Sequence, residues 1–500
     1  MVVLQCTRPP WLCLTLPMML SSEQRAAAIA LAQLGWQTFV GAQRMTLEQR
    51  ALGSAYRVDE PEHNRKALDE RALAWLGQAQ EALGRGAERT EEDTWLYEGL
   101  LRYRLATSLE SPFRSLLQAC LGAGLTMRRV AAYQDTYLPE LARRSELPGP
   151  RLGLAEQPEH GFALLFQRYR LEALIEMLLP IGRGRAADEL RIGVWQAQFS
   201  SSPVRYERSL YRHMHRVPLL IAGPVGTPVE AVARVLALSG YVPWDGERLR
   251  FTQEPALHVR IDSALDVTPE LLRQIGLGQS NTPEEAALGK LGYWVIRDID
   301  RLEPVAQYRL YLLLEDATKL GPRLLSTTGV DLGEAVSQGR FREDLYHMLA
   351  VHRVELPALS TQLRQRPDDL RYLVQRVLSP LLEGPELRSA VDEVTGHVEK
   401  KLSSHSFPGN QQELLRCAQA ILLAGEYRPP ARRAEPAAGP LTDLGRRFMA
   451  GDFDADGLLD AYCTLMYSRT GSYQESARRL GIDRRTVKSR VNEALLSELS

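Results

Sequence analysis

The sequence predicts a multidomain protein with three parts: an all-α N-terminal bundle, an α/β parallel-sheet domain with an α-helical lid, and a C-terminal unit of three helices. Residues 21–190 are rich in Ala, Leu, Glu, Gln and Arg at helical spacing. From Val217 onward, short apolar runs alternate with helical stretches, which is typical of a parallel sheet covered by helices. Near the C-terminus, two short helical patterns are separated at Gly481.

The start of the chain is uncertain. Residues 10–20 form an apolar run after Arg8, but the run contains proline and lacks a convincing cleavage site, so it matches a signal peptide poorly. A misassigned start, with translation beginning at Met18 or Met19, explains the run at least as well. No later stretch is long and apolar enough to span a membrane.

The N-terminal helical region shows no fixed repeat period, so an array of short helical repeats is not supported. We expect its aromatic residues, such as Trp75, Trp95 and Tyr97, to form the core of a bundle rather than a ligand pocket. Such a bundle suits a sensory or dimerising role.

Four apolar runs predict the strands of the central sheet. They are VPLLIAG (217–223), LHVRIDSA (257–264), YWVIRDID (293–300) and PRLLSTT (322–328). Helical patterns resume from Pro367 to Gly425, and the Pro- and Ala-rich stretch that begins at Arg428 predicts a flexible linker.

The turn after the first of these strands has the outline of a phosphate-binding loop. Gly223, Gly226 and Thr227 occupy the positions where backbone amides and a hydroxyl would hold phosphates and magnesium. The lysine position, however, holds Val229, and Pro228 has no backbone N–H to donate. The loop therefore lacks its main positive charge and one of its donors.

Three further segments occur in a familiar order: GRFREDLYHML (339–349), VELPALS (354–360) and FPGNQQELLRCAQAILL (407–423). In these segments the chain, from about Pro203 to Tyr427, resembles the AAA+ domain of sigma-54-dependent transcriptional activators, also called bacterial enhancer-binding proteins. The resemblance implies an ATPase fold that binds ATP or ADP with magnesium, and it gives Arg342 the role of an arginine finger.

The chain departs from that family at the positions that carry chemistry. Arg297 and Asp298 stand where the family has Asp-Glu, and in the alternative register Ile299 takes the glutamate position. Asp300 lies further along, and we expect Asp298 and Asp300 to cap the strand end. Three more of the family's catalytic positions are altered. Gly329 stands at the position of the polar sensor residue, Gln412 at that of the lid arginine, and Met348 at that of the second finger arginine.

These departures predict that nucleotide hydrolysis is lost, which leaves only Asp298 and Arg342 as degenerate catalytic positions and predicts no metal site. Gly223, Gly226 and Thr227 retain the means to make backbone contacts with a bound nucleotide. The family contacts sigma-54 through a GAFTGA loop between its two nucleotide motifs, and residues 270–292 have no such sequence. A sigma-54 contact is therefore not expected.

The C-terminal residues 471–491 predict a helix-turn-helix. Ser472 with Glu475 forms a capping-box pattern, Gly481 suits the turn, and Asp483 suits the next N-cap. Val487, Val491 and Leu495 are expected to face inward, and a preceding helix is expected to contribute a stripe for the same core, formed by Leu458, Leu459, Tyr462, Leu465 and Met466.

Residues 453–495 resemble the Fis-type DNA-binding domain of many bacterial regulators. From Arg469 to Asn492 there are seven Lys or Arg residues against two acidic ones. The residues expected to contact DNA are Arg484, Arg485, Thr486, Lys488, Ser489 and Asn492. The alternative is a helical hairpin with an ordinary charged surface.

Composition limits the other function classes. The formal net charge is −1, so any nucleic-acid binding must be local. The five cysteines show neither metal-ligand spacing nor a secreted framework, which favours the cytoplasm.

The leading hypothesis is a DNA-binding transcription regulator that forms a homo-oligomer, a dimer or higher, and binds double-stranded DNA without membrane contact. The alternatives are a working ATP-dependent sigma-54 activator with an unconventional nucleotide site, in which Arg297 holds phosphate charge, and a helical interaction protein whose tail only dimerises. The expected domains are 1–20 (uncertain extension), 21–195 (helical sensory or interaction domain), 196–365 (degenerate AAA+ α/β subdomain), 366–427 (AAA+ helical lid), 428–450 (linker) and 451–500 (Fis-type DNA-binding domain).

Overall fold

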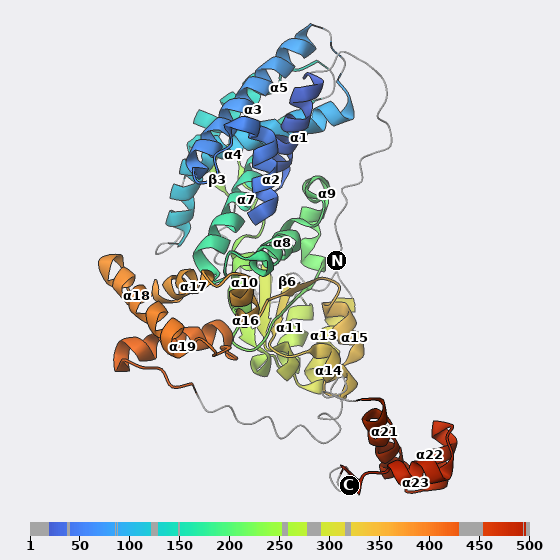
Figure 1. The fold of residues 1–500 in the computed structure, drawn as a ribbon. Coiled ribbons are helices and arrows are strands. Elements are labelled where there is room, and N and C mark those ends of the chain that lie inside the picture. Colours follow the sequence, from blue (N-terminus) through green and yellow to red (C-terminus); the bar gives the residue numbers. More distant parts are fainter. Residues whose placement is uncertain are drawn as a thin grey trace. The chain divides into compact units, whose positions relative to one another are not determined.

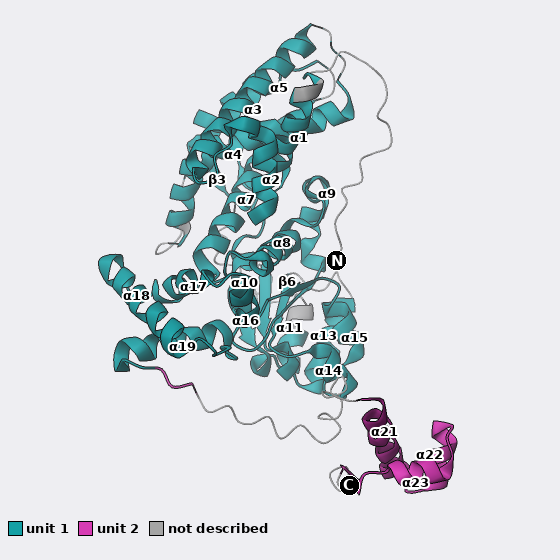
Figure 2. Cartoon of the chain, viewed as in Figure 1, with its two compact units in different colours: residues 1–426 teal, residues 427–500 magenta. Residues whose placement is uncertain are grey.

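The computed structural model divides the chain into two compact units, residues 1–426 and 427–500 (Figure 2). The structure describes residues 20–37, 41–85, 87, 89–121, 129–148, 151–252, 259–277, 292–315, 322–429, 454–493 and 495–496. The expected N-terminal extension, almost all of the expected linker and most of the interval expected to lack a GAFTGA loop lie outside these residues.

The first unit begins with helices, and no strand occurs among the described residues from 20 to 218, as the composition predicts. The main helices are α1 (Ser22–Trp36), α2 (Gly41–Leu52), α3 (Pro61–Gly84), α4 (Glu91–Leu121), α5 (Leu138–Ser145), α6 (Gly153–Glu156), α7 (Pro158–Leu178), α8 (Arg185–Phe199) and α9 (Pro203–Arg208) (Figure 1).

Helices α1 and α4 pack closely because small residues face each other. A Cβ on Gly35 would overlap the carbonyl oxygen of Gly99, and a Cβ on Gly99 would overlap Ala32. Trp75 and Tyr97 are buried in this core as expected, and Trp95 is half-buried and stacks on Trp36 with ring centroids 6.2 Å apart.

The sheet has five strands, β1 (Leu219–Ala222), β4 (Val259–Ser263), β5 (Tyr293–Arg297), β6 (Arg323–Thr328) and β7 (Arg353–Glu355). Their order is β4-β5-β6-β1-β7, and every neighbouring pair is parallel. Four of them match the predicted runs. Strands β1 and β6 are buried along their whole length, because helices cover both faces of a parallel sheet.

Alternate residues of the strands point to opposite helix layers. Leu219 and Ile221 pack with α7, α8 and α10 (Val229–Leu238), whereas Leu220 packs with α13 (Pro304–Glu315) and α15 (Glu343–Leu349). The N-terminal helices therefore supply part of one layer over the sheet. The α/β region also contains helices α11 (Pro269–Leu277) and α14 (Leu332–Ser337).

A short hairpin, β2 (Trp244–Asp245) and β3 (Arg250–Phe251), was not expected. It packs against the N-terminal core rather than the sheet, because Trp244 lies against Phe162 with ring centroids 4.7 Å apart. The N-terminal helices and the α/β region are thus joined by more than one contact.

Four helices form the lid, α16 (Leu359–Gln365), α17 (Asp369–Leu378), α18 (Gly384–Lys401) and α19 (Asn410–Ala424) (Figure 1). The buried carboxylate of Asp369 accepts hydrogen bonds from the backbone N–H groups of Arg183 and Gly184, at 2.7 and 3.1 Å. Gln362 accepts another from Gly182 at 2.9 Å. The loop before α8 therefore holds the lid.

The second unit contains α21 (Ala455–Thr470), α22 (Tyr473–Leu480) and α23 (Arg484–Arg490). Its core consists of Cys463, Ala477 and Val487, with Leu459, Tyr473, Leu480, Ile482 and Val491 packed around them.

The stripe expected on the first of these helices was partly wrong, because Leu458 is 39% and Tyr462 51% exposed. The helices approach α21 over the small residues Ala461, Cys463 and Thr464 instead. The second helix is also shorter than expected, since α23 ends at Arg490 and Val491 is extended. None of the described helices is long and apolar enough to cross a membrane.

Candidate functional site

In the second unit, α22 and α23 are joined by a tight turn. Ser472 caps α22 by accepting a hydrogen bond from the N–H of Glu475, and Gly481 ends the helix with φ +68°, a left-handed conformation that favours glycine. Asp483 occupies the N-cap position of α23 but makes no side-chain capping bond. The turn thus forms where the sequence predicts it.

The predicted capping box is only half made. The carboxylate of Glu475 pairs with Arg478 and Arg479, at 2.8 and 3.0 Å, and the N–H of Ser472 donates to the hydroxyl of Thr470 instead. The expectation that Glu475 returns to the cap was wrong, because two arginines on its own helix compete for its oxygens.

One face of α23 carries free positive charge. Arg484, Arg485 and Lys488 are exposed, and among the described residues they have no carboxylate partner. Arg490, by contrast, turns toward α21 and pairs with Asp456 and Asp460 at 2.7 and 3.0 Å. The helix therefore presents a basic surface that is not neutralised by its neighbours.

The other expected contact residues border this face. Ser489 and Asn492 are exposed and Thr486 is half-buried. Asn492 lies beyond the end of α23, and its N–H donates to the hydroxyl of Thr464 at 2.9 Å. The structure thus brings all six predicted residues to one end of the unit, with Thr486 the least accessible.

In the first unit, the loop after β1 lies at the carboxyl edge of the sheet, the edge where ligands bind in open α/β folds. Three backbone N–H groups of this loop and the hydroxyl of Thr227 are used internally, whereas the N–H of Gly226 makes no such bond in the described part of the chain. Gly223 donates to the carbonyl of Thr328 at 3.2 Å, Thr227 N–H donates to the carbonyl of Pro224 at 3.0 Å, and the hydroxyl of Thr227 donates to the same carbonyl at 2.7 Å. The N–H of Val229 donates to the carbonyl of Thr227 at 2.9 Å.

The lid is clamped onto this loop. The Asn410 side chain donates to the carbonyl of Val225 at 2.8 Å and accepts from the N–H of Leu359 at 2.8 Å, and it is almost fully buried. Gly226, at φ +84°, lies so close to Gly409 that a Cβ would overlap the Gly409 carbonyl. The clamp was not predicted from the sequence, where the FPGN segment served only as part of the resemblance to a family, although Pro-Gly-Asn is itself a turn pattern.

Arg297 points across the carboxyl edge of the sheet. Its guanidinium lies 3.6 Å from Glu230 in the first turn of α10, and its buried Nε has no hydrogen-bond partner in the described part of the chain. Asp298 follows in the left-handed region, at φ 51°, with its N–H donating to Thr327 at 3.3 Å.

Asp300 contacts the end of the neighbouring strand β6. Its carboxylate accepts a hydrogen bond from the hydroxyl of Thr328, the last residue of β6, at 2.7 Å. This bond joins two side chains, and Asp298 makes no side-chain capping bond in the described part of the chain, so the strand-end capping expected of the two residues is not seen. No group of three His, Cys, Asp or Glu side chains suited to a metal ion occurs among the residues that the structure describes.

Arg342 is held by its own chain. Its guanidinium forms two hydrogen bonds with Asp344, at 2.6 and 3.0 Å, and lies 4.9 Å from the ring centre of Tyr308. Asp344 holds the pKa of Arg342 above its usual value, and Arg342 in turn lowers the pKa of the Asp344 carboxyl. The expected finger residue is therefore exposed but already paired.

The remaining altered positions surround the same edge. Gly329 lies beside Val225, and the exposed Gln412 donates its N–H to the carbonyl of Gly226 at 3.1 Å. Met348 is half-buried at the end of α15 and packs with the apolar layer around α13.

Part of the first unit is similar to known proteins. Residues 211–359 match the model of the Sigma-54 interaction domain. The transcriptional regulatory protein ZraR of Klebsiella oxytoca is 28% identical over 218 residues, which cover 40% of this chain and 47% of that protein. The C4-dicarboxylate transport transcriptional regulatory protein DctD of Rhizobium meliloti is 30% identical over 210 residues, which cover 40% of this chain and 43% of that protein.

The match thus spans about half the length of these curated relatives. The crystal structure of NtrX from Brucella abortus aligns with a TM-score of 0.34 at 18% identity, over 73% of this chain and 81% of that one. Residues 211–359 are thus similar to the Sigma-54 interaction domain, and the relatives that share this part of the chain are transcriptional regulatory proteins.

Proposed function

We propose that this protein is a sequence-specific DNA-binding regulator of transcription whose AAA+ domain acts as a scaffold rather than as a motor. The observation that carries the proposal is the combination of an unneutralised basic face on α23 with a nucleotide loop that uses three of its backbone donors internally. The relatives' role in transcriptional regulation agrees with the first half of that combination.

The DNA-binding half of the proposal rests on α23. A short helix with Arg484, Arg485 and Lys488 on one exposed face suits the major groove, where Arg and Lys reach guanine O6 and N7 and the flanking charges meet phosphates. Because the whole chain has a net charge of −1, this face must supply the attraction locally. Ser489 and Asn492 then serve as neutral contacts at its rim.

The scaffold half rests on the loop 223–229. A magnesium nucleotide needs free backbone amides and a lysine, whereas here the amides of Gly223, Thr227 and Val229 donate within the protein. Pro228 supplies no donor, and Arg297 stands where a magnesium-binding carboxylate belongs, paired with Glu230. These residues do not fit a bound magnesium nucleotide, so we propose no hydrolysis at this site.

The pairing of Arg297 also argues against the alternative of a working ATPase. In that alternative Arg297 would hold phosphate charge in place of the lysine, but Glu230 already neutralises it from the adjacent helix. Arg342 is likewise occupied by Asp344 and Tyr308 within its own chain. Without hydrolysis or a GAFTGA sequence, remodelling of sigma-54 polymerase is not part of the proposal.

We further propose that the protein acts as a homo-oligomer, a dimer or higher. The exposed side chains of Leu458 and Tyr462, one helical turn apart on α21, offer an apolar contact for a second copy. Two copies would place two α23 helices on a twofold-related DNA site.

A salt series of gel shifts tests the DNA-binding proposal. On its selected DNA site, Arg485→Ala and Lys488→Ala should each weaken binding, and the loss of one phosphate contact should lower the salt slope by about 1. Lys400→Ala, which removes the same charge from an exposed position in the first unit, should leave both affinity and slope unchanged. Unchanged affinity in both α23 variants would eliminate this helix as the recognition element.

A further inference from the structure

A second kind of site lies in the N-terminal helices of the first unit. Helices α1, α2, α3, α4 and α7 line a partly open cavity of about 200 Å³. Its apolar wall includes Leu34, Phe113 and Leu165, all buried, with Tyr169 beside them. Arginine side chains converge on the same space from α2, α3 and α7. A cavity with an apolar body and a few convergent polar groups is typical of a small-molecule site.

The cavity retains hydrogen-bond donors that the described part of the protein does not use. Arg44, whose side chain is 43% exposed, bonds to Glu48 through Nε at 2.8 Å and also feels the charge of Glu172, and its two terminal nitrogens have no hydrogen-bond partner among the described residues. Tyr103 lines the cavity at 8% exposure, and its hydroxyl likewise has no partner there. Burial raises the pKa of Tyr103 to about 12, so the hydroxyl keeps its proton at neutral pH.

The acceptors of the cavity, in contrast, are engaged. Glu110 accepts hydrogen bonds from Arg65 and Arg114, at 3.0 and 2.7 Å, and Glu172 accepts one from Arg168 at 3.1 Å. Free donors beside occupied acceptors favour a ligand that brings negative charge. The apolar wall favours a ligand that also brings hydrocarbon surface.

We propose that this cavity binds a small organic carboxylate, with the carboxylate at Arg44 and Tyr103 and its apolar body against Phe113 and Leu165. Arg168 closes the cavity rather than binding the ligand, because its terminal nitrogens donate to the carbonyls of Leu34 and Gly35 at 2.7 and 2.6 Å. Arg65 lies at the rim, where it pairs with Glu110.

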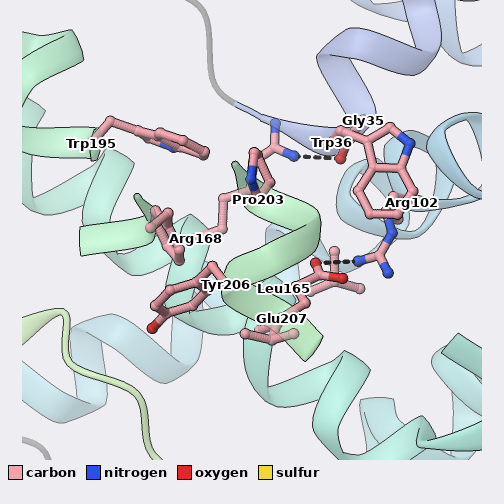
Figure 3. Close-up of a pocket in the computed structure, with 11 residues that line it drawn as sticks. Gly35, Trp36, Arg102, Leu165, Arg168, Trp195, Pro203, Tyr206 and Glu207 are labelled. Atoms are coloured by element: carbon pink, nitrogen blue, oxygen red, sulfur yellow. Dashed lines mark hydrogen bonds and ion pairs between the residues drawn. The ribbon is translucent and has the colours of Figure 1, made fainter. Parts of the chain in front are cut away.

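Arg168 and Leu165 also line a second, smaller cavity, shown in Figure 3. There Arg102 pairs with Glu207 of α9 at 2.6 Å and lies 4.2 Å from the ring centre of Trp36. Helix α9 is the last α-helix before β1 of the sheet. A ligand in the larger cavity would therefore contact the wall that joins the N-terminal helices to the α/β region.

Isothermal titration of the full chain, without DNA, tests the proposal. The probes are acetate, isobutyrate, benzoate and 3-phenylpropionate, with benzamide as the neutral match for benzoate and inorganic phosphate as an anion without hydrocarbon. We expect saturable 1:1 binding of at least one of the three larger carboxylates, and markedly weaker binding of acetate, benzamide and phosphate.

Two variants locate the site. Arg44→Gln should weaken the best carboxylate about tenfold or more, because a hydrogen bond to a charged group is lost, and Tyr103→Phe should weaken it about threefold. Arg50→Gln, an exposed arginine on the same helix α2, is the matched control and should bind as the natural protein does. Tyr103→Phe keeps the packing of the ring and so gives a readout even if Arg44→Gln does not fold.

Three results would overturn the proposal: no carboxylate binds, benzamide or phosphate binds as tightly as the carboxylates, or Tyr103→Phe and every folded Arg44 variant bind as the Arg50 control does. The titration contains no DNA and no nucleotide, so its outcome is independent of the function proposed above.

Discussion

The clamp between the lid and the loop after β1 makes a quantitative prediction for Asn410→Ala. The change removes the partner of two backbone groups, the buried N–H of Leu359 and the part-buried carbonyl of Val225. The unpaired N–H costs about 1–3 kcal/mol and the more accessible carbonyl about 1 kcal/mol. Alanine at φ 52° adds about 1 kcal/mol, because asparagine tolerates the left-handed region better than alanine does. We therefore expect a loss of about 4 kcal/mol in the free energy of unfolding.

Two companion variants separate these contributions. Asn410→Gly loses the same hydrogen bonds but not the strain, so it should be more stable than Asn410→Ala by about 1 kcal/mol or more. Asn410→Asp keeps an acceptor for the N–H of Leu359 but sets a carboxylate oxygen against the carbonyl of Val225, so it should be less stable than the natural protein.

Urea unfolding followed by tryptophan fluorescence is a suitable assay, since all seven tryptophans precede residue 300 and report only on the first unit. The reasoning is refuted if Asn410→Ala unfolds at the same urea concentration as the natural protein. It also fails if the glycine variant is the least stable of the three, because strain would then not contribute.

Three further predictions follow from other contacts. Gly226→Ala should lower the free energy of unfolding of the first unit by more than about 2 kcal/mol in the same assay, because it adds left-handed strain and a clash with Gly409. An unchanged free energy of unfolding would mean that the lid does not lie against the loop. Arg102→Met should cost about 2–3 kcal/mol by leaving the half-buried Glu207 unpaired, and Arg102→Met combined with Glu207→Leu should recover most of it; full additivity of the two changes would contradict the pairing. Burial raises the pKa of Cys417 to about 12, so at pH 8 only about one thiol in ten thousand is ionised, and mass spectrometry should find Cys417 alkylated by iodoacetamide only after unfolding.

The prediction of the sheet succeeded for the four longer strands. β1, β4, β5 and β6 lie within the four runs taken from the sequence, and the signal is clearest for β1, whose residues are all apolar because helices cover both of its faces. β7 and the β2–β3 hairpin escaped notice, since two or three residues are too few to show a pattern.

The C-terminal unit shows a different limit. The caps at Ser472 and the turn at Gly481 are local and could be predicted from neighbouring residues. The buried face of α21 could not be predicted in this way. In the sequence, large residues such as Leu458 and Tyr462 indicate the apolar face, whereas the small core of the unit is packed around Ala461 and Cys463. Which face of α21 is buried depends on how closely the other two helices approach it.

At the nucleotide loop, the sequence identified the missing lysine and the proline at once, since these positions adjoin the glycines. The contacts that close the loop join residues far apart in the chain. Asn410 meets Val225 across 185 positions, and no local pattern predicts such a pair. The unusual backbone of Asn410, at φ 52°, becomes visible only in the fold.

Phosphate release from magnesium ATP by the full chain, in the presence of its DNA site, tests the central claim most directly. Because the amides of Gly223, Thr227 and Val229 are used internally and Val229 replaces the lysine, the account predicts release at the rate of a protein-free control while the DNA remains bound. Release that saturates with ATP, and that Arg342→Ala abolishes, would contradict it and show that the AAA+ domain is a working motor.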